Sequence, residues 1–211
     1  MNKEIEYFFI DDFLDSELSE RLIREQNQMP AEETLPSLCG YLINPDGTCE
    51  EDVTNPTIYN RYHDNSILKS LLPTSTSETI DLLESKLKEH ISNPVVYNFR
   101  VITNITMDPT HTSGGWHKDY NPIEKFDDLT KQWITFYTLS GGNVDSEFQV
   151  SYTSEWPDVW QRGIREVLSD NRLFGHNMNL GHQYHQNENN DVMMIYIRWY
   201  DKPVPDFNRT K

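Results

Sequence analysis

Cysteine is nearly absent from this 211-residue sequence. Only Cys39 and Cys49 are present, on either side of an Asn-Pro-Asp-Gly stretch that predicts a turn. Two cysteines in a chain of this size do not make a disulfide framework. We therefore expect free thiols in a reducing compartment, although a turn here would also let the two cysteines face each other across a hairpin.

Long apolar runs are absent as well. No stretch approaches the roughly 20 apolar residues that a transmembrane helix needs. The apolar residues near the N-terminus are interrupted by Asp11 and Asp12, and no small-residue cleavage site follows, so a signal peptide is not expected. These absences predict a cytoplasmic protein that does not associate with a membrane.

Basic residues are scarce relative to acidic ones. The chain has 18 Lys and Arg against 34 Asp and Glu, which gives a formal net charge of −16. Such an acidic surface repels the phosphates of nucleic acids and of anionic membranes. We therefore expect no nucleic-acid partner, and the acidity favours a small molecule, a sugar or a peptide as the substrate.

Aromatic residues, by contrast, are plentiful, with five Trp, eleven Tyr and nine Phe, and they favour β-structure. The length suffices for one sizeable core and is short for two. We therefore expect a single domain over 1–211, with a helical and irregular N-terminal part at 1–94 and a β core at 95–200. Antiparallel pairing in a sandwich or barrel is favoured over a parallel sheet, because few helices separate the strands.

Local patterns predict the individual elements. A strand at 6–10 precedes a helix at 17–28 that Asp15 or Ser16 can cap, and a second helix lies within 75–91. The region 30–75 reads as irregular, with one short hairpin near 44–47. The remaining predictions are strands at 95–106, 132–140, 147–153, 173–185 and 192–200, and a short helix at 158–168.

The strand that begins at Val95 alternates between an apolar and a polar face. Tyr97 and Phe99 share one face, whereas Asn98 and Arg100 share the other. A polar face usually lies in solvent, but inside a barrel that holds a charged ligand the assignment reverses.

The stretch Gly-Gly-Trp-His-Lys-Asp, residues 114–119, places His117 and Asp119 two positions apart. Residues i and i+2 of a strand point to the same face, so an imidazole and a carboxylate can reach a common point. Two ligands do not define a metal site. A third must come from elsewhere, and His176, His182 and His185 lie in the later strand region.

The motif Trp-His-Lys-Asp, followed 65 positions later by Gly-His-x-x-x-x-Asn and then by a strand with an arginine, resembles the iron(II)- and 2-oxoglutarate-dependent oxygenases. The phytanoyl-CoA and prolyl hydroxylase branches are the most similar, and the opening FFIDDFLDSELSERLI resembles their strand-helix start. The resemblance implies a double-stranded β-helix, or cupin-like jelly roll. It also implies a dioxygenase that uses Fe(2+), 2-oxoglutarate and O2 to hydroxylate a C–H bond.

Carried over to this chain, the family's metal motif falls on His117, Asp119 and His182. His182 is preferred as the distal ligand because Asn187 follows five positions later, and His185 is the alternative. Two imidazoles and one carboxylate suit octahedral iron(II) and leave three positions open for the cosubstrate and O2. An Asp at position 119 implies oxygenation, since related halogenases have a small residue there. We expect His111 and His176 to be structural or exposed.

The cosubstrate anchor departs from the family pattern. Many members have an arginine ten to twelve residues beyond the distal histidine, but here that window contains Val192, Met193 and Met194. Arg198 lies 16 residues beyond His182 and remains the first choice, with Arg100 as the alternative. A guanidinium paired with a carboxylate in a dry cavity suits either residue.

Two other functions stay open. The missing arginine at the usual offset supports a cupin-like metalloenzyme that does not use 2-oxoglutarate. The His-x-Asp pair could also be accidental in a non-catalytic jelly roll that binds a partner or has a structural role. No motif in the sequence identifies the substrate.

Overall fold

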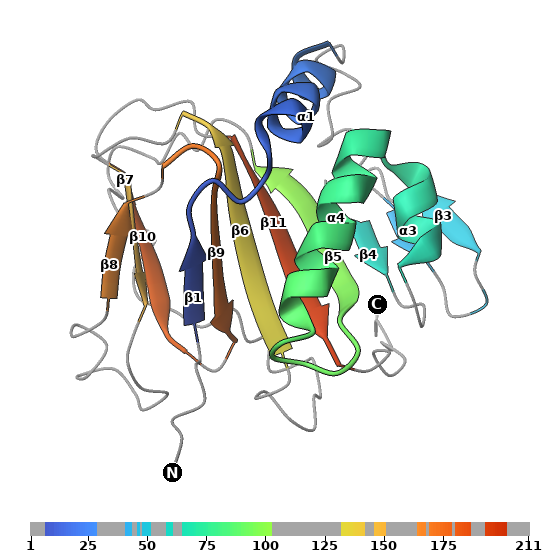
Figure 1. Ribbon diagram of the computed structural model, residues 1–211. Helices are drawn as coiled ribbons and strands as arrows, with labels where there is room; N and C mark the ends of the chain where they lie inside the picture. Colours follow the sequence, from blue (N-terminus) through green and yellow to red (C-terminus); the bar gives the residue numbers. More distant parts are fainter. Residues whose placement is uncertain are drawn as a thin grey trace. The chain divides into compact units, whose positions relative to one another are not determined.

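The computed structural model describes residues 7–28, 41–43, 46, 48–51, 58–60, 65–102, 132–141, 146–150, 164–167, 169–178, 180–186 and 193–201 (Figure 1). The chain divides into two compact units. The first unit contains residues 1–13 and 102–195, and the second contains residues 14–101 and 196–211. Over the described ranges, no helix is long and apolar enough to cross a membrane.

The first unit contains two antiparallel groups of strands. In one group, β9 (Arg172–Asn177) lies between β1 (Tyr7–Ile10) and β6 (Gln132–Ser140) and pairs with both. The second group has the order β10, β7, β8, comprising β10 (His182–Gln186), β7 (Ser146–Val150) and β8 (Ile164–Val167).

Aromatic side chains fill the interior of the first unit. Phe174 of β9 stacks against Phe9 of β1 at a ring-centroid distance of 4.5 Å and against Phe136 of β6 at 6.1 Å. All residues of β6 except its last are buried. Burial on both faces explains why the apolar and aromatic residues of 132–140 do not alternate strictly with polar ones.

An ion pair connects Arg172, the first residue of β9, to Asp11, which follows β1. Arg172 donates to the carboxylate of Asp11 from Nε at 2.5 Å and from Nη2 at 3.1 Å. These hydrogen bonds lower the pKa of Asp11 below its usual value. The contact fixes the chain where it leaves β1, beside the start of β9.

The second unit contains its own strands, in the order β5, β4, β2, β3. These are β5 (Val95–Ile102), β4 (Ile58–Asn60), β2 (Tyr41–Ile43) and β3 (Cys49–Glu51). The β2–β4 pair is parallel, whereas β2–β3 and β4–β5 are antiparallel. The strand β11 (Met193–Tyr200) starts in the first unit and continues in the second from Tyr196.

The antiparallel pair of β2 and β3 confirms the short hairpin predicted near 44–47. Cys49 at its end is a free, exposed cysteine, as expected, and Cys39 lies outside the described residues. The turn region is stabilised by Asp46, whose carboxylate accepts hydrogen bonds from the backbone N–H and the hydroxyl of Thr48.

Three of the helices that the structure describes belong to the second unit. The helix α1 (Ser16–Gln28) is capped by Asp15, whose carboxylate accepts the N–H of Leu18 at 2.8 Å. It contacts α4 (Thr74–Leu87), which in turn contacts α3 (Ser66–Leu71). The apolar stripes predicted for α1 and α4 are buried, at Leu14, Leu18, Leu22, Ile80, Leu83 and Leu87.

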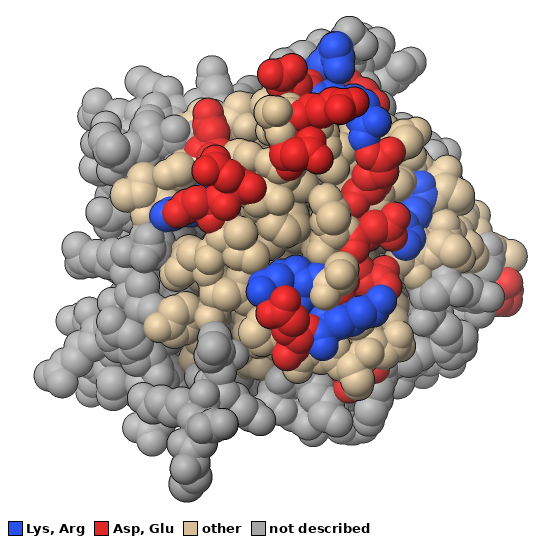
Figure 2. All heavy atoms as spheres, in the orientation of Figure 1, with Lys and Arg blue, Asp and Glu red and all other residues tan. Residues whose placement is uncertain are grey.

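The acidic surface is visible over α1 and α4, where Asp and Glu side chains gather among fewer Lys and Arg (Figure 2). Part of this charge is paired. Lys88, the residue after α4, bonds Glu84 at 3.2 Å, and Lys86 bonds Glu89 beyond the end of the helix at 2.6 Å. Arg21 of α1 pairs with Glu78. Such exposed pairs contribute little to stability, so they mainly keep the face soluble.

Several predicted elements need correction. Residues 164–167 form the strand β8 and not the end of a helix at 158–168. The single strand predicted at 173–185 is two strands, β9 and β10, which pair with different neighbours. The region 30–75, predicted to be irregular apart from one hairpin, also contains α3 and β4. The overall prediction of a mainly β fold with N-terminal helices is confirmed.

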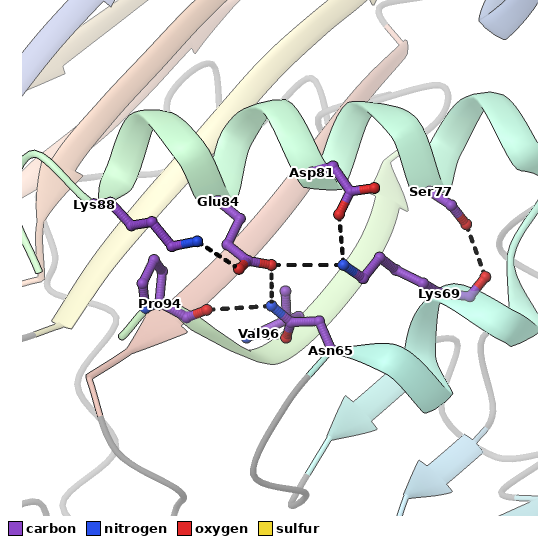
Figure 3. Close-up of polar contacts among 8 residues, drawn as sticks. All are labelled: Asn65, Lys69, Ser77, Asp81, Glu84, Lys88, Pro94 and Val96. Atoms are coloured by element: carbon purple, nitrogen blue, oxygen red, sulfur yellow. Dashed lines mark hydrogen bonds and ion pairs between the residues drawn. The ribbon is translucent and has the colours of Figure 1, made fainter. Parts of the chain in front are cut away.

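Asn65 connects the helices to β5 in the second unit (Figure 3). Its amide nitrogen donates to Glu84 at 2.9 Å and to the carbonyl of Pro94 at 3.2 Å. Its amide oxygen accepts the backbone N–H of Val96 at 2.8 Å. The side chain is 4% exposed, so all three bonds lie in or near the interior, and they fix where β5 begins.

Asn65→Ala should therefore destabilise the protein more than the loss of one small side chain suggests. The substitution leaves the buried Val96 N–H and Pro94 carbonyl without partners, at a cost of about 3 kcal/mol in the free energy of unfolding. Urea denaturation followed by circular dichroism measures the loss. Lys86→Ala, which removes an exposed ion pair with Glu89, is the control and should change stability by no more than about 0.5 kcal/mol. Equal midpoints for the two variants would contradict the role assigned to Asn65.

Candidate metal and carboxylate sites

His182, the preferred distal ligand, is the first residue of β10 and lies opposite Val150 of β7. It is 3% exposed. A buried imidazole at the start of a strand is held in a defined direction by the strand's pairing, as a metal ligand requires. The side chain therefore has the burial and the placement expected of a ligand.

His185 occupies the same strand, opposite Glu147. Positions 182 and 185 are three apart, and successive strand positions alternate between faces. Only one of the two positions can therefore share a face with a given ligand. His182 and His185 therefore remain alternatives for the distal ligand.

His117 and Asp119, the first two predicted ligands, lie outside the described residues, and so does His111. Across the described part of the chain, no three His, Cys, Asp or Glu side chains gather into a group that could hold a metal ion. The predicted ligand set therefore stays a prediction, with only its His182 member described.

His176 was expected to be structural or exposed, and it is fully buried, beside His182. The two ring centroids are 4.7 Å apart, with the ring planes at 52°. His176 comes from β9, where it lies opposite Ile134 of β6 and Tyr7 of β1. In the sequence, the only indication that His176 is buried is that it lies within a run of core residues, 173–178.

Two phenylalanines frame this pair of histidines. The His176 ring stacks near Phe174 at 5.3 Å and near Phe136 at 6.1 Å. Phe136 also presents its ring edge-on to His182 at 6.4 Å. Aromatic rings therefore make up part of the surroundings of both imidazoles.

The two candidate anchor arginines share one neighbour in the second unit. The guanidinium carbon of Arg100 in β5 lies 4.3 Å from the ring centroid of Tyr196 in β11. Arg198 donates from Nε to the Tyr196 hydroxyl at 2.5 Å, and its guanidinium carbon is 5.7 Å from the same ring. The alternatives named from the sequence therefore belong to one cluster.

This cluster has the character of an anion site. Arg100 Nε is buried and has no hydrogen-bond partner among the described residues. Asn98, on the same face of β5, is 6% exposed, so the polar face of this strand does not lie in solvent. Two guanidiniums on a buried polar face suit a carboxylate, which accepts paired N–H bonds from such groups.

Comparisons with known proteins extend this description. No protein-family model matches the chain, and no curated protein matches it. Among solved structures, the α-ketoglutarate-dependent epimerase SnoN from nogalamycin biosynthesis has a TM-score of 0.59, at 12% identity over 99% of this chain and 87% of that chain. The carbocyclase SnoK from the same biosynthesis has a TM-score of 0.56, at 14% identity over 94% and 80%.

AviO1 from Streptomyces viridochromogenes Tue57 gives a TM-score of 0.54, at 15% identity over 95% of this chain and 92% of that chain. At these identities the likeness establishes the fold alone. The chain has the jelly-roll fold of the non-heme iron and 2-oxoglutarate-dependent enzymes, so the predicted fold class and the resemblance that implied it are confirmed at that level.

The residue before His176 depends on close packing. Gly175 of β9 lies opposite Phe8 of β1, and a Cβ added at Gly175 would sit 2.3 Å from Phe8 Cζ. The Phe8 ring also stacks on Trp133 at 5.6 Å. Only glycine lets the ring cross β9 at this point, next to the histidine pair.

Gly175→Ala should cost about 2 kcal/mol of stability, because the added methyl group overlaps an aromatic ring that is already packed. Adding Phe8→Leu should relieve the overlap, so the double variant should be more stable than the sum of the two single losses predicts. Thermal and urea unfolding of the wild type, the two single variants and the double variant measure this coupling. Strict additivity of the two changes would refute the clash.

Proposed function

We propose that the chain is an iron(II)- and 2-oxoglutarate-dependent dioxygenase that hydroxylates a C–H bond of a small molecule, sugar or peptide. The observation that carries the proposal is the buried His182 at the start of β10, in a fold shared with non-heme α-ketoglutarate-dependent enzymes. A SnoN structure described as containing Fe3+, α-ketoglutarate and nogalamycin RO has a TM-score of 0.58 at 10% identity, which supports this cofactor class.

In this proposal His117, Asp119 and His182 hold the metal. The donor types fit, because imidazole and carboxylate ligands suit iron(II), and the Phe136 ring packs edge-on against the buried His182. Iron(II), once bound with 2-oxoglutarate and O2, supplies the oxidation of the C–H bond, with succinate and CO2 as co-products. The protein's own contribution is to hold the ligands and keep the surroundings dry.

Arg198 is proposed to bind the distal carboxylate of 2-oxoglutarate. Arg100 either assists Arg198 or binds the carboxylate in its place. Tyr196 orients both, since its hydroxyl accepts from Arg198 and its ring faces Arg100. Its contact with Arg198 uses Nε of that guanidinium. We further propose, from the composition and charge, that the protein acts in the cytoplasm as a single domain over 1–211.

A cupin-like metalloenzyme that does not use 2-oxoglutarate is the second candidate. The observation in its favour is the spacing, because Met193 and Met194 follow His182 where many family members have the anchor arginine. The two candidates differ in one product, since only the first releases succinate when the protein is incubated with iron(II), 2-oxoglutarate and O2.

His182→Ala should weaken metal binding by about 100-fold or more, because one imidazole donor is lost. Anaerobic titration of the full chain with Fe(II) or Mn(II) measures the affinity. His185→Ala distinguishes the alternative ligand and should leave the affinity within about twofold. His90→Gln, which removes a histidine at the end of α4, is the neutral control. A loss of affinity in His185→Ala with none in His182→Ala would reverse the assignment.

Arg198→Ala should raise the KM for 2-oxoglutarate by roughly 10- to 100-fold, because a charge-assisted pair is removed. Succinate release measures the rate. Tyr196→Phe keeps the ring facing Arg100 but removes the hydroxyl that Arg198 contacts, so a smaller rise is expected. Arg172→Ala, an arginine that binds Asp11, is the matched control. If wild-type protein binds metal but releases no succinate, the second candidate function replaces the first.

A further inference from the structure

Gln132, the first residue of β6, has a buried polar side chain whose amide oxygen is not paired. The residue is 3% exposed, and Oε1 accepts no hydrogen bond from any residue that the structure describes. An unpaired buried acceptor is unfavourable, and the large majority of buried polar groups in native proteins have partners. Because the fold keeps this oxygen in the interior, a ligand is the partner that would make its position favourable.

The strand register places Gln132 at the end of the first unit where β10 begins. The backbone N–H of Met178 donates to the carbonyl of Gln132 at 2.9 Å, which continues the β6–β9 pairing by one position beyond Trp133 and Asn177. His182 follows Met178 by four residues and is the first residue of β10. Gln132 therefore lies where the chain passes from β9 to the strand that carries the preferred metal ligand.

Alternation along β6 determines which face carries Gln132. Positions 132, 134 and 136 share one face of the strand. On that face, the ring of Phe136 lies 6.4 Å from the ring of His182. Ile134 lies opposite His176, which also contacts His182. The Gln132 side chain is therefore on the face of β6 that turns toward His182.

The kind of atom that is unpaired determines the kind of ligand. An amide oxygen only accepts hydrogen bonds, so its partner must present an O–H or N–H group. Both carboxylates of 2-oxoglutarate are ionised at neutral pH and also only accept, so the cosubstrate cannot be this partner. A substrate with a hydroxyl or an amide N–H can be. Sites that pair with such a group discriminate strongly against analogues that lack it.

We propose that Gln132 binds the substrate, through a hydrogen bond in which a substrate hydroxyl or amide N–H donates to Oε1. That the ligand is the substrate rests on the proposed function, whereas the donor-binding site itself does not. The substrate class is thereby narrowed to molecules that carry an O–H or N–H group, and Gln132 becomes a residue that determines specificity.

NMR of the wild-type full chain labelled with ¹³C-glutamine tests the donor site without metal or cosubstrate. The Cδ resonance of Gln132 is assigned by its loss in Gln132→Met, and it moves downfield when Oε1 accepts a hydrogen bond. We expect a saturable downfield shift with ethylene glycol and none with dimethoxyethane, in which methyl groups replace both hydroxyl protons. No shift with ethylene glycol, or a saturable shift with fully ionised succinate, which only accepts, would overturn the proposal. Gln132→Glu serves for the assignment if the methionine variant does not fold.

Gln132→Met gives a second readout, because it keeps the length of the side chain and removes its polar atoms. The melting temperature should rise by about 2–4 °C, since a buried unpaired oxygen is lost. The KM for 2-oxoglutarate, measured by succinate release, should stay within about twofold of the wild-type value. Thr138→Val is the matched control. It removes a buried, unpaired hydroxyl from the same face of β6, roughly 20 Å along the strand, and should leave the ethylene glycol shift of Gln132 unchanged.

The outcomes separate this inference from the proposed function. Succinate release by a chain whose Gln132 resonance does not respond to ethylene glycol would overturn the donor site and leave the oxygenase proposal standing. A donor-selective shift in a chain that releases no succinate would support the donor site and count against the oxygenase. A rise of about tenfold or more in the KM for 2-oxoglutarate in Gln132→Met would assign the residue to the cosubstrate and overturn the inference.

Discussion

The two-sided pairing of β9 is the constraint on which the interior of the first unit depends. Because β9 is bonded to β1 on one edge and β6 on the other, its residues cannot shift without breaking hydrogen bonds on both sides. Gly175 makes this pairing compatible with the Phe8 ring that crosses the strand. Phe174 and His176, on either side of that glycine, are thereby held in the core.

The second unit shows how polar groups are placed when a strand is buried on its polar face. Asn65 satisfies the backbone where β5 begins, and further along the strand Arg100 lies against the ring of Tyr196. Arg198 reaches the hydroxyl of the same tyrosine. Two half-buried guanidiniums beside one aromatic ring suit a carboxylate, which accepts paired N–H bonds from such groups.

Much of the fold was predictable from local pattern. The helices α1 and α4 follow from apolar residues at helical spacing, and β6 and β11 follow from long β-forming runs. The strand β8 and the division of 173–185 into β9 and β10 were missed. Residues 164–167 have no strong alternation, and the break after Asn177 is decided by which strands are available to pair with each half.

The candidate site, like the fold, was predictable from the sequence only in part. The sequence named His182 as the candidate distal ligand from its spacing to the His-x-Asp motif, and it named Arg198 and Arg100 as alternative anchors although the usual arginine offset is missing. It also determined the acidic surface, the free Cys49 and the mainly β fold with helices before it, since composition and periodicity are properties of the chain itself. Only the tertiary structure decided that His176 meets His182 and that both arginines meet at Tyr196. Those contacts join residues on different strands, and strand pairing over long sequence distances, which no local pattern encodes, brings them together.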